Sequence, residues 1–265
     1  MRSKSHGSWA GYARFFALRQ ARRLLAAAAD MIWPPVSPLS GREVSRPGEL
    51  DAQDWNAVRF IDRPICRTCG VPFDHPSYDD MDCPACLARP PVFDRARSAF
   101  LYDAESRALV LGLKHAGRTD AVAAFGRWMA RAGADAVKDA DALIPVPLHA
   151  SRLRSRRFNQ SLLLAHAVAK VTGDAVDPHA LVRVRRTGTQ GGLTAKGRTR
   201  NVAGAFKVRD RAVLRVAGAR LVLIDDVFTT GATLNACARA LKRAGAENVN
   251  AITLARVVKP VDPTK

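Results

Sequence analysis

Hydrophobic and polar positions alternate in blocks along the C-terminal two thirds of the chain. Short apolar runs typical of buried strands cover residues 99–102, 142–146, 220–224 and 249–255. Apolar residues with helical spacing cover residues 105–115, 120–136, 159–171 and 233–244, and paired extended segments are expected at 181–184 and 205–208. Strands that alternate with helices in this way are typical of a parallel sheet with helical crossovers. We therefore predict an α/β fold in which ligands bind beyond the carboxyl ends of the strands.

The N-terminal third has a different pattern. Residues 13–32 have the spacing of an amphipathic helix, which either packs on the body of the protein or lies on a membrane surface. We expect three parts, namely a helical part at 1–35, a ribbon region at 36–94 and an α/β domain at 95–260. No run approaches the roughly twenty apolar residues of a membrane span, and no clear cleavage site marks a secretory signal. The expected location is cytoplasmic, with peripheral contact at the inner membrane as an alternative.

The charge is strongly positive. The chain has 265 residues, of which 48% are hydrophobic, so it can bury a full core plus a smaller module. Lys and Arg outnumber Asp and Glu by 42 to 24, which gives a net charge of +18. Residues 152–201 alone hold eleven basic residues against two aspartates. This distribution favours phosphorylated or polyanionic partners, although a generally basic, solubilising surface has the same composition.

Four cysteines have the spacing of a metal site. Cys66, Cys69, Cys83 and Cys86 form two C-x2-C pairs separated by thirteen residues, and Gly70 follows the first pair. Two such pairs complete a closed tetrahedral zinc site, which would hold a fold and leave no position for catalysis. Two disulfides are the competing interpretation. A lone fifth cysteine, Cys237, and the lack of an export signal favour a reducing compartment and structural zinc.

A weaker version of the same spacing lies upstream. The sequence SPLSG at residues 37–41 matches the frame of CRTCG at 66–70, and Asp51-x2-Asp54 follows as the second cysteine pair does. We interpret this as a duplicated ribbon whose first copy has lost its ligands, because serine is a poor zinc ligand. A chance match in short loops is the alternative.

The strongest candidate for a ligand site is LVLIDDVFTTGAT at residues 221–233. A buried strand runs into Asp225 and Asp226, and small hydroxylated residues then lead into a helix. Backbone amides and threonine hydroxyls of such a turn form an anion cradle, in which Gly231 is expected to leave space for a phosphate. The carboxylates suit ribose hydroxyls, with a divalent cation bridging sugar and pyrophosphate oxygens.

This stretch resembles the phosphoribosyl pyrophosphate (PRPP) motif of type I phosphoribosyltransferases, from which it departs mildly at Phe228. Together with the four-cysteine ribbon, three further segments resemble the ComF (competence protein F) family: LKHAGR at 113–118, IPVPLHASRLRSRRFNQS at 144–161 and QGGLTAKGRTRNVAGAF at 190–206. The resemblance implies a type I phosphoribosyltransferase fold with an N-terminal zinc ribbon. Arg157 stands where many members have glycine, and SPLSG stands where many have a further cysteine ribbon.

The resemblance also implies roles for individual residues. The catalytic candidates are Asp225, Asp226, Arg157, Lys196 and Arg198. The candidates for holding PRPP or its 5'-phosphate are Val227, Phe228, Thr229, Thr230, Gly231, Ala232 and Thr233. Further substrate contacts are expected from Lys114, Arg152, Asn159, Gln160, Gln190 and Asn201, although Asn159 equally suits the N-cap of the following helix. The basic, glycine-rich span 187–201 has no apolar face and is expected to form a mobile lid.

Three functions are compatible with these patterns. The protein binds PRPP or a ribose phosphate nucleotide with Mg²⁺ and transfers phosphoribose to an acceptor. Alternatively, as the ComF resemblance implies, it handles single-stranded DNA with the DNA-uptake machinery and has little or no catalysis. The basic span would then follow a phosphodiester backbone, but Phe158 is its only aromatic residue. A purely structural zinc adaptor is the third interpretation. The patterns indicate neither the acceptor nor the oligomeric state.

Overall fold

The structure is a computed structural model that describes residues 34–74, 80–115, 120–149, 158–185 and 195–258. The amphipathic helix expected at 13–32 lies outside these residues. Within them, no helix is long and apolar enough to cross a membrane.

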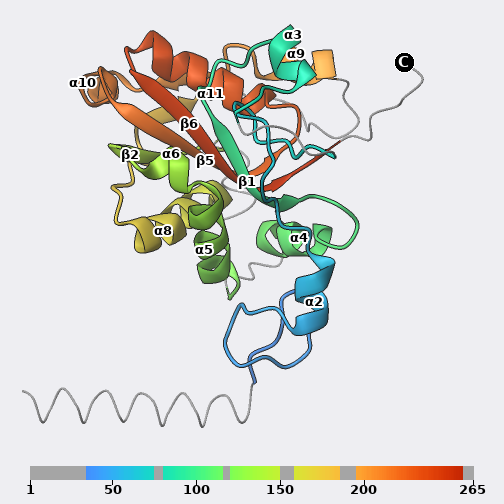
Figure 1. The fold of residues 1–265 in the computed structure, drawn as a ribbon. Coiled ribbons are helices and arrows are strands. Elements are labelled where there is room, and N and C mark those ends of the chain that lie inside the picture. The colour runs from blue at the N-terminus through green and yellow to red at the C-terminus, as the bar shows by residue number, and fades with distance from the viewer. Residues whose placement is uncertain (1–33, 75–79, 116–119, 150–157, 186–194, 259–265) are drawn as a thin grey trace, which may run out of the picture.

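A four-stranded parallel sheet forms the centre of the molecule (Figure 1). Its strands, in spatial order, are β1 (Ala96–Leu101), β6 (Asn248–Arg256), β5 (Arg220–Phe228) and β2 (Ala142–Pro145). This confirms the predicted α/β fold with a parallel sheet. The sequence pattern ended the fifth strand at Ile224, but β5 continues to Phe228. The extension forms because Asp225, Val227 and Phe228 still pair with β6 after β2 has ended opposite Ile224.

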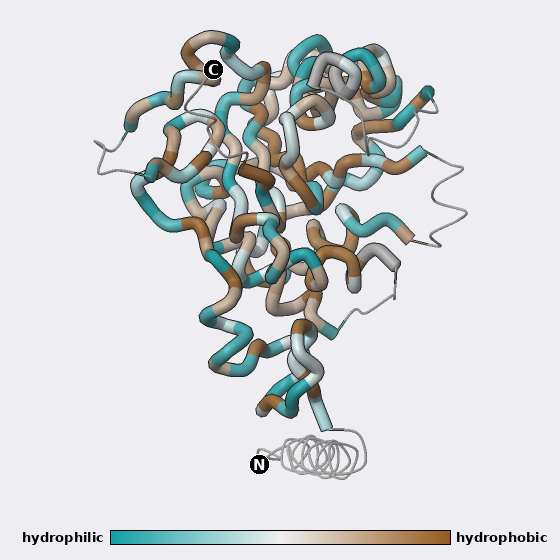
Figure 2. Tube along the Cα trace, turned by 90° about the vertical axis from the view of Figure 1, so that its right-hand side faces the viewer, coloured by the Kyte–Doolittle hydropathy of each residue, from teal (hydrophilic) through white to brown (hydrophobic). Residues whose placement is uncertain are grey.

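Helices cover both faces of the sheet. One face is covered by α4 (Arg107–His115), α5 (Val122–Ala132), α6 (Ala134–Val137) and α8 (Gln160–Thr172). The other face is covered by α11 (Ala232–Arg243), α9 (Ala195–Val202) and the antiparallel hairpin of β3 (Leu181–Arg183) and β4 (Phe206–Val208). Residues of β5 alternate between the two cores, with Leu221 and Leu223 on the α11 side and Val222 and Ile224 on the α5 side. The strand is therefore apolar on both faces, and hydrophobic residues concentrate along the central strands (Figure 2).

Two helical predictions need correction. The helix expected at 120–136 is divided at Gly133, where an added Cβ would lie 2.2 Å from Cδ1 of Ile252. The second half of the span expected as a lid is the helix α9, which packs beside α11 with Val202 buried. The pattern did not predict four short elements, α2 (Ala52–Ala57), α3 (Pro84–Ala88), α10 (Val213–Val216) and a 3-10 turn (Asp210–Ala212).

The described residues of the ribbon region belong to the two cores of the α/β domain and form no separate core. Its first half, with Leu39, Leu50 and Phe60, packs into the core on the α5 side. Its second half, with the four cysteines and Phe73, packs into the core on the α11 side. Between them, the chain crosses the edge of the sheet, where the amide of Ile61 donates to the Ala99 carbonyl of β1 at 3.0 Å. Residues 36–94 therefore complete the domain on both faces, and α2 and α3 lie far apart (Figure 1).

The contact between α5 and α8 yields a test of this packing. At Gly126 of α5, an added Cβ would lie 2.6 Å from the carbonyl carbon of Ala167 in α8. Helix propensity alone favours Gly126→Ala by about 1 kcal/mol, but the backbone contact should reverse the sign and cost about 1–3 kcal/mol. Urea unfolding measures the difference, with Arg127→Ala on the same helix as the control. An increase in the free energy of unfolding for Gly126→Ala would contradict the close approach.

Candidate functional site

The two adjacent acids lie where β5 runs past the end of β2. Asp225 and Asp226 are both half-buried. One oxygen of Asp225, Oδ1, accepts from Ser161 Oγ at 3.0 Å and from the amide of Asp226 at 2.9 Å. Ser161 stands in the first turn of α8, so the start of this helix orients the carboxylate. No role was predicted for Ser161 from the sequence, although this residue ends the segment 144–161 that resembles the ComF family.

The turn after the acids ends in the N-terminus of α11. Gly231 is the N-cap residue in a left-handed conformation, with φ of 72°, and no side chain caps the helix. Thr230 Oγ1 is buried without a hydrogen-bond partner among the described residues. The amides at a helix start that no side chain caps and a buried hydroxyl without a described partner both suit an anion. The candidates from Val227 to Thr233 thus lie together at the end of β5 and the start of α11.

Gly231 was expected to leave open space for a phosphate, and this reason for the glycine was wrong. An added Cβ would lie 3.1 Å from Cζ of Phe228 and 3.5 Å from Nδ2 of Asn235, not in open space. The left-handed backbone and the packing of the Phe228 ring therefore require the glycine, whatever the turn binds.

The other candidate residues fall into three groups. Asn159 caps α8, because its Oδ1 accepts from the amide of Ser161 at 3.1 Å and its Nδ2 donates to the Val146 carbonyl at 3.2 Å. Gln160 is buried, and Asn201 lies in α9, where its carbonyl accepts from Arg185 at 3.0 Å. Lys114, Lys196 and Arg198 belong to α4 and α9, but the structure does not describe their side chains. Arg152, Arg157 and Gln190 lie outside the described residues.

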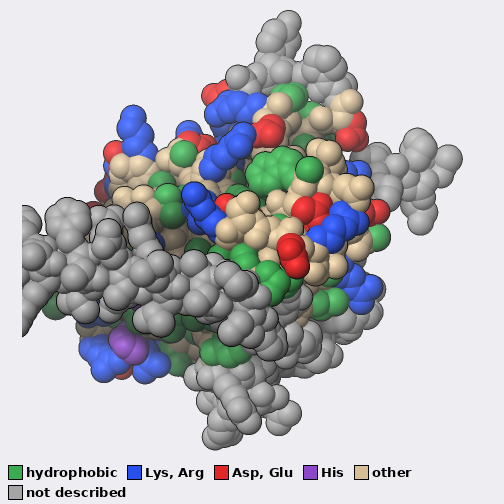
Figure 3. Space-filling model, turned by 90° about the horizontal axis from the view of Figure 1, so that it is seen from below, with side chains coloured by type: hydrophobic (Ala, Val, Ile, Leu, Met, Phe, Trp, Pro, Cys, Tyr) green, Lys and Arg blue, Asp and Glu red, His purple; other side chains and the backbone are tan. Residues whose placement is uncertain are grey.

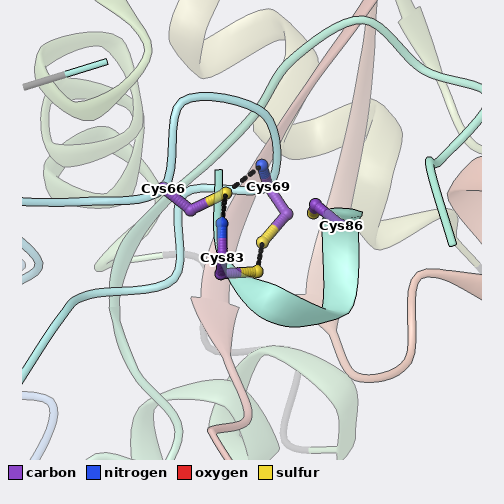
Figure 4. A group of neighbouring side chains, drawn as sticks. All are labelled: Cys66, Cys69, Cys83 and Cys86. Carbon is purple, nitrogen blue, oxygen red and sulfur yellow. Dashed lines mark hydrogen bonds between the residues drawn. The ribbon is translucent and has the colours of Figure 1, made fainter. Parts of the chain in front are cut away.

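The four cysteines form one compact cluster (Figure 4). Their Sγ atoms all lie within 4.8 Å of one another, and all four residues are buried. The amides of Cys69 and Cys83 point at Cys66 Sγ at 3.4 and 3.3 Å, and Cys83 begins the short helix α3. Four convergent sulfurs held by backbone amides fit a tetrahedral zinc site. The ion would cross-link the turn that carries Cys66 and Cys69 to the start of α3 with Cys83 and Cys86, and these two segments together are called the cysteine knuckle.

The thiols of this cluster differ in acidity. The hydrogen bond from Cys69 lowers the pKa of Cys66 to about 4, with the backbone amides acting in the same direction. The same hydrogen bond raises the pKa of Cys69, and burial raises the pKa of Cys86 to about 12. An ion bound by four thiolates must therefore displace protons, so its affinity falls as the pH falls. Burial raises the pKa of Cys237 as well, and this thiol stands apart from the cluster as an unreactive core residue.

A buried arginine joins the cysteine cluster to the turn. Arg256, at the end of β6, donates from Nη1 to the Cys69 carbonyl at 2.6 Å and from Nη2 to Cys69 Sγ at 3.3 Å. Its guanidinium lies over the ring of Phe228, 4.1 Å from the centroid. Arg256 was not predicted as a site residue from the sequence. A charge that ends a buried strand was the available signal, and the same signal identified Asp225 and Asp226.

The upstream segment has the backbone of the cysteine knuckle. Positions 36 and 43 form an antiparallel bridge, as positions 65 and 72 do, and Gly41 and Gly70 both have positive φ. In both segments a short helix starts after the third ligand position. In the upstream segment, the four positions that correspond to the cysteines hydrogen-bond to one another. The Asp54 carboxylate accepts from the hydroxyls of Ser37 and Ser40, and Ser40 also donates to Asp51 at 3.0 Å. A duplication predicts this shared geometry.

Comparisons with known proteins relate the chain to one family and to proteins of two named functions. Residues 159–263 match the family described as phosphoribosyl transferase domain. The chain is 36% identical over 199 residues to a DNA utilization protein of Salmonella typhi, which covers 73% of this chain and 85% of the relative. It is 31% identical to competence protein F of Haemophilus influenzae over 73% of this chain and 85% of the relative. Among solved structures, glutamine PRPP amidotransferase from B. subtilis is similar with a TM-score of 0.37 and 22% identity, over 54% of this chain and 30% of that chain.

We expect one zinc per chain. The four thiols converge, whereas hydroxyl–carboxylate hydrogen bonds already occupy the upstream knuckle. Metal analysis of purified protein should find one equivalent, Cys69→Ser should lose it, and Cys237→Ala should keep it. Two equivalents would show that the upstream segment also binds metal, and disulfide-linked thiols without metal would contradict the zinc site.

Proposed function

This chain belongs to the ComF family of the type I phosphoribosyltransferase superfamily, and from this premise we propose that it binds PRPP, or a ribose phosphate nucleotide, together with Mg²⁺. Its parallel sheet, with helices on both faces and a four-cysteine ribbon, is the fold of that family. The ligand site we propose is the turn between β5 and α11.

The observation that carries this proposal is the junction of two acids and a helix start on one turn. In the proposed complex, the amides and hydroxyls of residues 229–233 hold the 5'-phosphate, and Thr230 Oγ1 gains the partner that it lacks among the described residues. Asp225 and Asp226 hold the ribose hydroxyls, and Mg²⁺ would supply positive charge to the pyrophosphate oxygens when bound. Ser161 keeps the Asp225 carboxylate oriented toward the same ligand.

The proposed reaction is transfer of phosphoribose to an acceptor. A nucleophilic atom of the acceptor forms a bond to the anomeric carbon, the bond from that carbon to pyrophosphate breaks, and pyrophosphate leaves with the electron pair. The acceptor then gives up its proton. The negative charges of Asp225 and Asp226 offset the positive charge that develops on the ribose. We assign Arg157, Lys196 and Arg198 to the pyrophosphate, because guanidinium and ammonium groups bind such oxygens and α9 carries two of these residues.

A second candidate function is the handling of single-stranded DNA with little or no catalysis. Relatives of this chain bear the names DNA utilization protein and competence protein F, and the basic span 152–201 suits a phosphodiester backbone. The structure also reveals an aromatic cluster of Trp55, Phe60 and Trp128, with Trp55 45% exposed. However, acids stand beside arginines around it, and mixed charges surround the exposed hydrophobic side chains at this end of the molecule (Figure 3). The acids around the aromatic cluster would repel a polyanion. The cluster therefore supports DNA binding less well than the turn after β5 supports binding of a ribose phosphate.

The proposed location is the cytoplasm, where thiols stay reduced and a four-cysteine site persists. Partners in DNA-uptake machinery belong to the second candidate function. Calorimetry with PRPP, free nucleotides and single-stranded oligonucleotides, each with and without Mg²⁺, distinguishes the two functions.

Removal of the two charges at the end of β5 tests the proposed site. Asp225→Asn with Asp226→Asn should change the free energy of unfolding by less than about 1 kcal/mol, because an amide oxygen can still accept from Ser161. Affinity for PRPP with Mg²⁺ should fall at least about tenfold, since amides do not replace ionised ligands beside a divalent cation. The control is Asp139→Asn with Asp210→Asn, which removes the same charge from exposed positions. Unchanged PRPP binding in the first variant would make the acids structural.

The basic residues of α9 are expected to act on affinity. Lys196→Ala with Arg198→Ala should change the free energy of unfolding by no more than about 0.5 kcal/mol. PRPP affinity should fall and depend less on salt, because two cations no longer attract the pyrophosphate. Arg209→Ala with Arg211→Ala removes the same charge elsewhere and should leave binding unchanged. A large fall in melting temperature with unchanged binding would assign the two residues to the fold.

A further inference from the structure

A cleft of about 770 Å³ lies between the cysteine knuckle and the turn after β5. Small-molecule sites in proteins typically measure roughly 300–1,000 Å³. One wall is the segment that leaves the knuckle, with Pro90 and Pro91. The opposite wall includes Thr229 and Thr230, so the cleft shares its edge with the proposed ribose phosphate site.

The charged side chains that line this cleft are all positive. They are Arg89, Arg200, Arg239 and Arg256, and no acidic residue of the described chain lines the cleft with them. Arg89, Arg200 and Arg239 are exposed, and none of them forms an ion pair with another described residue. Three exposed cations, from the knuckle, α9 and α11, therefore line one cleft that has no acidic side chain among its described lining, which favours an anion there.

The deepest of these arginines has an unused donor. Arg256 is 7% exposed, and its two terminal nitrogens are held by Cys69. Its third nitrogen, Nε, is buried and has no hydrogen-bond partner among the residues described. A buried charged donor without an acceptor is costly, and an anionic ligand in the cleft would relieve the cost.

The apolar walls are suited to a flat ring. The Phe228 ring lines the cleft, with the Arg256 guanidinium over one face and the edge-on ring of Phe93 at 6.0 Å. Two consecutive prolines stand on the knuckle side, where the Asn235 side chain of α11 accepts from the Val92 amide at 2.6 Å and holds the segment in place. The two rings are themselves buried, so the prolines, of which Pro90 is exposed, offer the rigid apolar surface on which a planar molecule can stack.

From these observations we propose that the cleft binds a small, planar, anionic molecule, a ring acid whose negative group faces the arginines. The inference rests on the proposed function, because it makes this molecule the acceptor that lies beside PRPP. The cysteine knuckle then contributes a wall of the acceptor site in addition to its structural role, and Arg256 contacts both.

Pairs of planar ring molecules, of which one member carries a carboxylate and the other is neutral, test the proposal. Orotate is compared with uracil, and nicotinate with nicotinamide, by calorimetry on the full-length, zinc-loaded protein with and without PRPP and Mg²⁺. Within at least one pair, the acid should bind at least about tenfold more tightly than its neutral counterpart. The acid should also lose affinity as the salt concentration rises.

Variants at the rim of the cleft locate the binding. Arg89→Gln with Arg239→Gln should weaken the acid at least about tenfold and leave the neutral counterpart and PRPP unchanged. The control is Arg243→Gln with Arg211→Gln, which removes the same charge. Arg243 lies one helical turn beyond Arg239 on α11 and does not line the cleft. Circular dichroism melting confirms that both double variants fold.

The outcomes separate this inference from the proposed function. PRPP binding without preference for either acid overturns the acceptor site and leaves the ribose phosphate site standing. Acid binding that depends on Arg89 and Arg239, in a protein that does not bind PRPP, supports the cleft and refutes the proposed function. Two further outcomes overturn the inference. One is an equal loss of acid affinity in the rim and control variants. The other is tight binding of a single-stranded oligonucleotide that depends on Arg89 and Arg239, in a protein that binds neither acid.

Discussion

The pairing of β5 determines the rest of the structure. The strand is buried on both faces and is paired on both edges only as far as Ile224, where β2 ends. Its partner on the other side, β6, continues, so four more residues of β5 remain in register at the carboxyl edge of the sheet. Asp225 and Asp226 are carried out of the core on a rigid strand, because the backbone hydrogen bonds to β6 hold them there. The turn proposed to bind the ligand and the start of α11 come directly after these four residues.

Arg256 connects the end of β6 to the cysteine knuckle. Opposite Phe228 on β6, it stacks on that ring and reaches the carbonyl and sulfur of Cys69. A cation in this position stabilises a cluster of thiolates as well as the aromatic residue beside the turn. The knuckle, the turn and the cleft between them therefore form one connected unit, although their residues are separated by more than 180 positions in the chain.

The two knuckles show two solutions to one folding problem. Each must close a tight loop onto a short helix in a segment with no separate core. Sulfur atoms that fit a zinc ion close the second, and serine and aspartate hydrogen bonds close the first. The two halves pack on opposite faces of the sheet, next to its edge strand β1. The first knuckle therefore keeps the same backbone arrangement with hydrogen bonds at the positions where the second has sulfur atoms.

The sequence by itself determined the alternation of the sheet strands with the longer helices, the spacing of the four cysteines and the acids at a strand end. These depend on periodicity and spacing over fewer than about twenty residues, which local patterns report directly. It misjudged the end of β5, the break at Gly133, the helix α9 and the reason for Gly231, because each depends on a partner distant in the chain, such as β6, Ile252, α11 or Phe228. Only the tertiary structure decided that the ribbon divides between two faces and that four arginines meet in one cleft. Such contacts come from packing between segments, and packing leaves no local period in the sequence.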